Sequence, residues 1–268
     1  MKKRYILFPT LIILMVWMMA YIISRYVALA DVSEPTNTIF NMVNVLFTAL
    51  AFTGVIGSLY YQTVESRRAS KELVERSILE LFTIYTSSDF QKTKDNAFFC
   101  LLLAVKDSQY ARFLTSRLFP IERQPFPDSV LAHYKALKPE LSNKSRDEIV
   151  DYDRAARLKL DDALNFFAML SHKEAAKDVI QHVDFAYDWW RPTLWLIAQL
   201  QKENRAKHQS IQHYCRNPLL HATLGQLDAM YDYPLLTSDE EVYRYLHSHP
   251  WLQEQQIDPA FFTGRIIE

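Results

Sequence analysis

Glycine is scarce in this chain of 268 residues, which contains only four. A sheet of several strands needs tight turns, and glycine supplies the positive φ angles that many of those turns require. Phosphate-binding loops are also built on glycine, and the sequence contains no such loop, no nucleophile elbow and no kinase signature. The scarcity therefore favours an all-α fold and excludes the enzyme classes that these motifs define.

Cysteine and an excess of basic charge are lacking as well. Cys100 and Cys215 are the only cysteines, too few for a disulfide framework, and we expect both to be reduced and buried. The 30 Lys and Arg residues are balanced by 31 Asp and Glu residues, which gives a formal net charge of −1. Broad nucleic-acid binding would require a basic surface, so we do not expect it.

Charge is absent from two long apolar segments, residues 5–23 and 39–61. Each segment is close to the roughly 20 residues that a helix needs to cross the hydrocarbon core of a bilayer. The sequence therefore predicts an all-α protein with an N-terminal two-helix transmembrane hairpin, residues 1–72, followed by a cytoplasmic helical domain, residues 73–268. Because neither segment contains an ionisable acid, base or histidine, an ion-coupled transporter is not expected.

Basic residues predict the orientation of this hairpin. They precede the first segment and follow the second one, whereas the loop between the segments holds only Arg25 beside two acidic residues. By the positive-inside rule, both termini face the cytoplasm. A cleavable signal ending at Ala30 is the competing interpretation, but the apolar core is longer than in a typical signal. The basic residues are Lys2, Lys3, Arg4, Arg67, Arg68 and Lys71.

Small and polar residues on the second segment predict a membrane association face. Small residues recur every four positions from 49 to 57, a spacing that allows helices to approach closely. Amide side chains near the start of the segment need hydrogen-bond partners in hydrocarbon. Two interpretations remain open: association of several copies, or packing against the first segment of the same chain. The predicted face comprises Asn44, Thr48, Ala49, Thr53, Gly54 and Gly57.

Apolar periodicity predicts helices through the remaining chain. A helical face from Leu73 to Tyr85 continues the second segment, and residues 97–105 read as a buried core helix. Ser145 and Glu148 have the spacing of a capping box, followed by helical periodicity to Leu170. A further helix is predicted from Val179 to Trp190. Pro192 is expected to end or kink it, or to start the next helix.

One short motif suggests chemistry. Residues 216–221 read Arg-Asn-Pro-Leu-Leu-His and resemble the Arg-Asn-x-x-x-His motif of the HEPN ribonucleases. The resemblance implies that Arg216 holds an RNA phosphate while His221 moves a proton; the alternative is a capping or surface role. Four residues, His208, His213, Cys215 and His221, have the residue types of zinc ligands without the paired spacing, so no metal site is expected. No cofactor is expected either.

Three other segments carry a second resemblance. Residues 47–54, 163–167 and 188–190, in this order after two spans, resemble the bacterial two-transmembrane abortive-infection proteins, which include effectors encoded beside retron reverse transcriptases. The resemblance implies a non-enzymatic antiphage effector of the bacterial inner membrane, restrained by partners and released on infection to disrupt that membrane. Its implied partners are the lipid bilayer, further copies of the second span, and a reverse transcriptase with its DNA–RNA product. The alternatives are a membrane-tethered HEPN-like ribonuclease and a non-toxic sensor or scaffold.

Overall fold

The computed structural model describes residues 4–28, 35–119, 123–173, 177–183, 185–207 and 220–264. Helix accounts for 82% of the structure, and the described ranges contain no strand, which confirms the all-α class. The chain divides into two units, Met1–Leu73 and Val74–Glu268.

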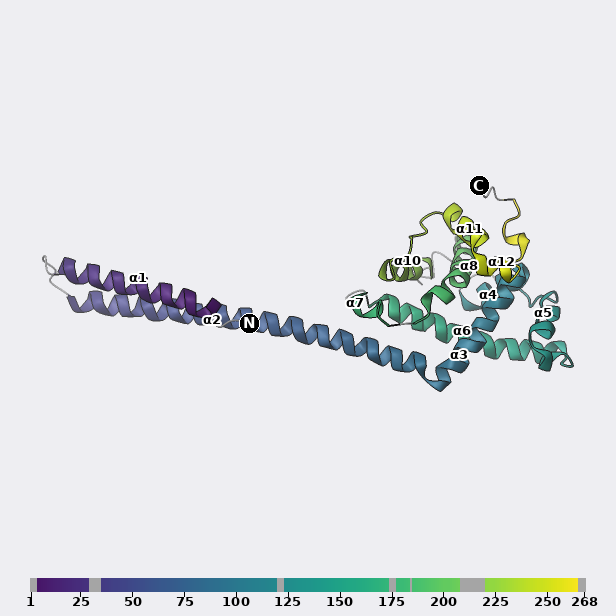
Figure 1. Cartoon of the computed structure of the whole chain (residues 1–268), viewed down its shortest axis with the longest axis horizontal. Coiled ribbons are helices and arrows are strands. Elements are labelled where there is room, and N and C mark those ends of the chain that lie inside the picture. Colours follow the sequence, from purple (N-terminus) through teal and green to yellow (C-terminus); the bar gives the residue numbers. More distant parts are fainter. Residues whose placement is uncertain are drawn as a thin grey trace. The chain divides into compact units, whose positions relative to one another are not determined.

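The first unit contains α1 (Arg4–Ala28) and the first part of α2 (Pro35–Thr86). Figure 1 shows the two helices running in opposite directions. Within α1 the rings of Trp17 and Tyr21 stack at a centroid distance of 5.7 Å. Large apolar side chains on both helices remain exposed, so burial inside the protein does not account for their presence.

A polar section of α2 follows its apolar part. Every residue from 65 to 73 is exposed, so packing does not stabilise the helix here. Opposite charges at Arg68, Glu72, Arg76 and Glu80 follow one another at four-residue spacing, which supports an isolated helix. Arg76 Nε lies 3.3 Å from Glu80 Oε1. The helix runs unbroken to Thr86, and the predicted continuation of the second segment is confirmed.

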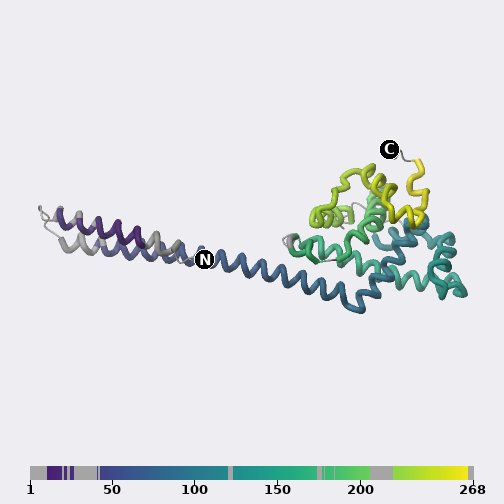
Figure 2. The backbone as a smooth tube through the Cα atoms, viewed as in Figure 1, coloured from purple at the N-terminus to yellow at the C-terminus, as the bar shows by residue number. Residues whose placement is uncertain are grey.

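The second unit is a helical domain that includes the end of α2 (Figures 1 and 2). Helix α8 occupies its centre, because every residue from 190 to 201 is buried and the helix contacts α3, α4, α10 and α11. Its further elements are α3 (Ser88–Lys106), α4 (Ser108–Leu118), α5 (Val130–Leu137), η1 (Pro139–Leu141), α6 (Arg146–Ser171), α7 (Lys177–Ile180), α8 (Tyr187–Lys207), α10 (Leu220–Met230), α11 (Asp239–Ser248), α12 (Pro250–Glu254) and η3 (Pro259–Phe261).

Local signals position several of these helices as predicted. Residues 97–105 lie in α3, and all but Phe98 and Leu102 are buried, which confirms a core helix. The Ser145 side chain accepts from the Glu148 N–H while the Glu148 carboxylate accepts from the Ser145 N–H, so the predicted capping box begins α6. A second capping box, between Ser238 and Glu241, begins α11 and was not predicted.

The predicted helix from Val179 to Trp190 is wrong. Helix α7 ends at Ile180, and α8 does not begin until Tyr187. Ala186 has a φ of 50°, a left-handed conformation in which the hydrogen-bond pattern of a right-handed helix does not continue. Pro192 lies inside α8, so it neither ends nor starts a helix, and the predicted kink stays a prediction.

Aromatic rings join the end of α2 to the core of the second unit. Tyr85 is buried and lies 5.2 Å from the Phe166 ring of α6 and 5.5 Å from the Phe185 ring. Phe90, in the first turn of α3, contacts Phe166 at 5.1 Å. Because aromatic contacts of this kind add to the free energy gained from burial, they hold α2, α3 and α6 together.

Candidate functional site

The apolar part of α2 is the most unusual surface of the described chain. Its large side chains face outward, with exposed fractions of 67% for Phe47 and 66% for Phe52. Exposed apolar area costs about 25 cal/mol per Å² in water, so a run of such side chains requires a nonaqueous environment or a partner. Among the described residues, one helix is long and apolar enough to cross a membrane, the section Val43–Thr86 of α2.

The predicted association face divides into two groups on α2. Ala49, Thr53 and Gly57 are half-buried, whereas Asn44 and Thr48 are exposed. At about 100° per residue, Thr48 lies roughly 140° around the helix axis from Thr53. The remaining predicted residue, Gly54, is exposed and lies between the two groups. The structure therefore does not bring the six residues together on one face.

The two threonine hydroxyls of this region bond to their own helix. Thr48 Oγ1 donates to the Asn44 carbonyl oxygen, and Thr53 Oγ1 donates to the Ala49 carbonyl oxygen, each at 2.8 Å. Threonine satisfies its donor in this way inside apolar helices. The Asn44 amide has a larger hydrogen-bonding requirement, because it carries two donor hydrogens and an acceptor oxygen.

A buried carboxylate in the second unit was not predicted. Asp228 of α10 has no exposed area and accepts four hydrogen bonds. Arg191 Nε and Nη2 donate to its two oxygens at 2.7 and 2.9 Å, the Tyr187 hydroxyl donates at 2.7 Å, and Trp195 Nε1 donates at 3.2 Å. Burial and the neighbouring carboxylate raise the pKa of Tyr187 well above its ordinary value, so the hydroxyl remains a donor.

The Arg191 guanidinium is enclosed on its other sides. Its central carbon lies 4.9 Å from the Tyr233 ring centroid and 4.5 Å from that of Tyr245, and its Nη2 also donates to the Pro234 carbonyl at 2.9 Å. A planar cation between aromatic faces is stabilised by cation–π attraction. The guanidinium is thus nearly buried, and the ion pair connects α8 and α10.

A second buried carboxylate, Asp153, lies on α6. The hydroxyls of Tyr110 and Tyr134 donate to its Oδ1 at 2.7 and 2.8 Å, and Arg157 Nε donates to its Oδ2 at 2.6 Å. Burial raises the pKa of both tyrosines, with Asp153 adding to the shift. Cys100 lies near this carboxylate. It is buried and not in a disulfide, which agrees with the prediction, whereas Cys215 lies outside the described residues.

The HEPN-like residues are described only in part. His221 lies in the first turn of α10, while Arg216 lies outside the described residues. His208 and His213 also lie outside them. Within the described ranges, no three His, Cys, Asp or Glu side chains gather in a way that could hold a metal ion.

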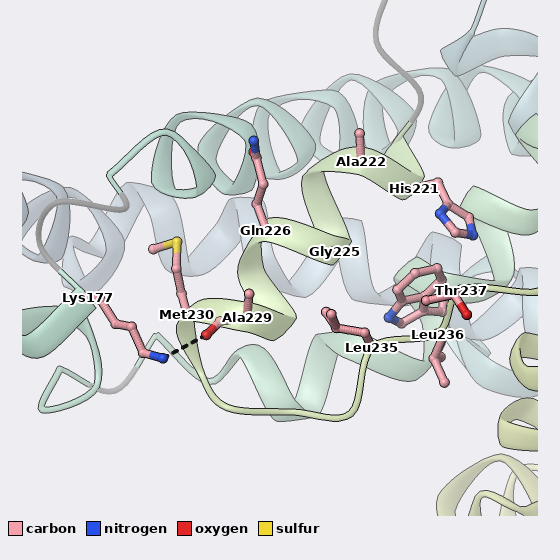
Figure 3. Close-up of a pocket in the computed structure, with 11 residues that line it drawn as sticks. Lys177, His221, Ala222, Gly225, Gln226, Ala229, Met230, Leu235, Leu236 and Thr237 are labelled. Atoms are coloured by element: carbon pink, nitrogen blue, oxygen red, sulfur yellow. Dashed lines mark hydrogen bonds between the residues drawn. The ribbon is translucent and has the colours of Figure 1, made fainter.

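His221 lines a pocket of about 690 Å³ beside α10, shown in Figure 3. Its ring meets the Trp195 ring edge-on at 4.6 Å. Gly225 faces open space, since a Cβ built on it meets no atom within 4 Å. Lys177 Nζ donates to the Ala229 carbonyl at 3.0 Å and pairs with Asp232 at 2.6 Å. The remaining lining residues are Ala222, Gln226, Met230, Leu235, Leu236 and Thr237.

The electrostatics of His221 favour a neutral imidazole. Burial lowers its pKa below the ordinary value, and Lys202 lowers it further. Its Nε2 atom is buried and has no hydrogen-bond partner among the residues that the structure describes. A neutral imidazole can accept a proton, but none of the described residues that line the pocket is a carboxylate that could orient the ring.

No protein-family model matches the chain, and no curated protein or solved structure matches it. The class therefore comes from the structure itself: over the described residues the protein is all-helical, and one helix there is long and apolar enough to cross a membrane.

Proposed function

We propose that this chain is a membrane-anchored antiphage effector whose α1 and α2 form a two-helix transmembrane hairpin in the bacterial inner membrane. The observation that carries the membrane part is the outward-facing apolar surface of α2, which contains no charged residue between 43 and 64. In a bilayer these side chains meet lipid tails, and the exposure has no energetic cost.

The first helix has the properties of a second span. α1 contains 25 residues and ends at Ala28, before a short connection to Pro35. Its central side chains alternate between strongly exposed ones, such as Met15 and Val16, and half-buried Trp17 and Tyr21. Half-buried positions at helical spacing are what packing against α2 produces, while the exposed positions would contact lipid.

Orientation follows from the charges at the ends of the two helices. Arg67, Arg68 and Lys71 are exposed on α2 just beyond the apolar residues. Basic residues are retained on the cytoplasmic side during insertion, so this end of α2 would be cytoplasmic. Both termini and the helical domain would then lie in the cytoplasm, and only the short connection would face outward.

The effector role comes from the resemblance to two-transmembrane abortive-infection proteins. It implies that partner components, such as a reverse transcriptase with its DNA–RNA product, restrain the helical domain until infection releases it. The released spans would then associate and disrupt the membrane, so that growth stops. Within this proposal the domain's role is regulatory, and the buried ion pair of Arg191 and Asp228 is structural.

Dye entry tests this function directly. Cells induced to express the full chain alone are mixed with a membrane-impermeant nucleic-acid dye, and fluorescence is followed beside growth. We expect dye entry to begin together with growth arrest. Gly57→Leu should insert but admit no dye, since the larger side chain enters a half-buried position and separates packed helices. Gly54→Leu is the matched control, because a Cβ at Gly54 meets no atom within 4 Å.

Two other outcomes would replace the proposal. Growth arrest with the dye excluded would exclude large membrane lesions and leave two functions, leakage of small ions and the membrane-tethered ribonuclease. The neutral imidazole of His221 beside an open pocket is the observation that supports the ribonuclease. Normal growth with no dye entry in cells that insert the chain would favour the non-toxic sensor or scaffold.

A further inference from the structure

A polar strip follows the whole apolar part of α2. Its residues are separated alternately by three and four positions, and every one of them is exposed. Apart from Val55, they are polar or small. We call them the heptad strip: Asn41, Asn44, Thr48, Ala51, Val55, Ser58 and Gln62.

The heptad strip lies opposite the side of α2 that is half-buried. At about 100° per residue, the centres of the two strips are roughly 160° apart around the helix axis. Large exposed side chains such as Val45, Phe47 and Ile56 occupy the flanks between them. The half-buried strip consists of Val43, Leu46, Ala49, Leu50, Thr53 and Gly57.

The three surfaces of α2 suit different neighbours. The half-buried strip is the side covered by the chain itself, and its small residues allow close packing. The flanks suit contact with lipid. The heptad strip does not suit lipid, because amide side chains need hydrogen-bond partners in hydrocarbon. It does not suit the first span either, because it lies opposite the half-buried side of α2.

Chemistry indicates what covers the heptad strip. An asparagine amide both donates and accepts hydrogen bonds, so the Asn44 side chain of another copy is a complete partner for it. Thr48 needs no partner for its donor, since its hydroxyl already donates a hydrogen bond to the Asn44 carbonyl oxygen. Alternation of three and four residues is also the spacing at which helices pack with a small left-handed crossing.

We infer that several copies of this chain associate through the heptad strips of their α2 helices. This inference rests on the proposed transmembrane hairpin and names the surface at which copies meet. Asn44 amides bond between copies, and Ala51 and Ser58 keep the helices close farther along the span. In a ring of copies the same polar side chains face the common axis, where they line a path for water or ions.

Cysteine cross-linking in membranes tests the inference. Ala51→Cys and Ser58→Cys place a thiol on the heptad strip, while Val45→Cys and Ile56→Cys place one on an equally exposed flank. Each full-length variant is oxidised in isolated membranes, and the parent chain, which has only Cys100 and Cys215, provides the background. We expect covalent dimers from the first two variants and only background from the flank variants.

A further substitution examines the amide itself. In the Ser58→Cys chain, Asn44→Leu should reduce the dimer yield, whereas Asn44→Gln should retain it because it keeps the amide. Equal cross-linking on strip and flank would show random collision and overturn the inference. The readout is independent of dye entry. Dimers on the strip without dye entry would leave the association intact and refute a lesion large enough to admit the dye. Dye entry without strip dimers would refute the association and leave membrane damage intact.

Discussion

Arg191 of α8 and Asp228 of α10 form a buried two-point ion pair, with Nε 2.7 Å from Oδ1 and Nη2 2.9 Å from Oδ2. Only 6% of the arginine side chain and none of the aspartate side chain is exposed. A buried charge that loses its partner lowers the stability of the fold, so we expect substitution of either residue to destabilise the packing of α8 against α10.

Asp228→Ala should destabilise the helical domain by about 3 to 5 kcal/mol, because it leaves the Arg191 cation buried without its counter-charge. The donors of Tyr187 and Trp195 also lose their acceptor. Thermal or urea unfolding of the full chain, followed by circular dichroism, measures the change. Asp151→Ala is the matched control, since its pair with Arg154 is mostly exposed and is worth less than about 1 kcal/mol. Similar losses in both variants would contradict the role given to Asp228.

Cys100 should resist alkylation in the folded protein. Burial, with a contribution from Asp153, raises its pKa from 9.0 to about 12, so the reactive thiolate is scarce at pH 8. Iodoacetamide labelling at pH 8, read by mass spectrometry of the Cys100 peptide, should be slow in buffer and fast in denaturant. Fast labelling without denaturant would show that the thiol is accessible.

The same pKa shift makes stability depend on alkaline pH. Because the folded pKa lies above the unfolded value, the contribution of the thiol is complete below about pH 9 and is lost as the pH rises toward 12. Cys100→Ala should therefore lessen the fall in stability over this pH window relative to the parent chain. An unchanged slope would assign the alkaline loss to other groups, such as the buried tyrosines.

Two glycines should respond oppositely to alanine. Gly225 lies inside α10, and an added Cβ meets no atom within 4 Å, so Gly225→Ala should stabilise the domain by about 0.5 to 1 kcal/mol. Gly264 has a φ of 77°, where a side chain is strained, and Gly264→Ala should cost about 1 to 2 kcal/mol. Unfolding midpoints of the two variants measure the difference. A loss of stability in Gly225→Ala would show that the space beside α10 is occupied.

The variant His221→Ala distinguishes toxicity by membrane damage from toxicity by RNA cleavage. If the chain acts by damaging membranes, the variant should arrest growth and admit dye as the parent does, because His221 lies outside the membrane helices. His247→Ala, at an exposed position of α11, controls for loss of a histidine. Loss of killing in His221→Ala but not in His247→Ala would contradict membrane damage as the cause of toxicity and favour RNA cleavage.

Helix boundaries could be predicted from the sequence where their signal is local. Ser145 and Glu148 are three residues apart, and their capping box forms as predicted. Between Val179 and Trp190 the apolar residues have helical spacing, but the backbone adopts a left-handed conformation at Ala186 and interrupts the helix. Periodicity records which side chains are buried, and a residue can be buried on either side of a break.

The candidate association face was harder to predict for a geometric reason. Asn44 and Thr48 were grouped with Ala49, Thr53 and Gly57 because all are small or polar and close in sequence. Exposure separates them into a half-buried and an exposed group. Which side of a helix is covered depends on its neighbours, and residue type alone does not contain that information.

The sequence by itself determined the helical class, the apolar segments and the cap at Ser145, because glycine scarcity, hydropathy and capping act over a few adjacent residues. Only the tertiary structure decided that Arg191 neutralises Asp228 and that Asp153 collects two tyrosine hydroxyls. These partners are far apart along the chain, and a buried charge acquires its counter-charge only when the helices that carry them have packed.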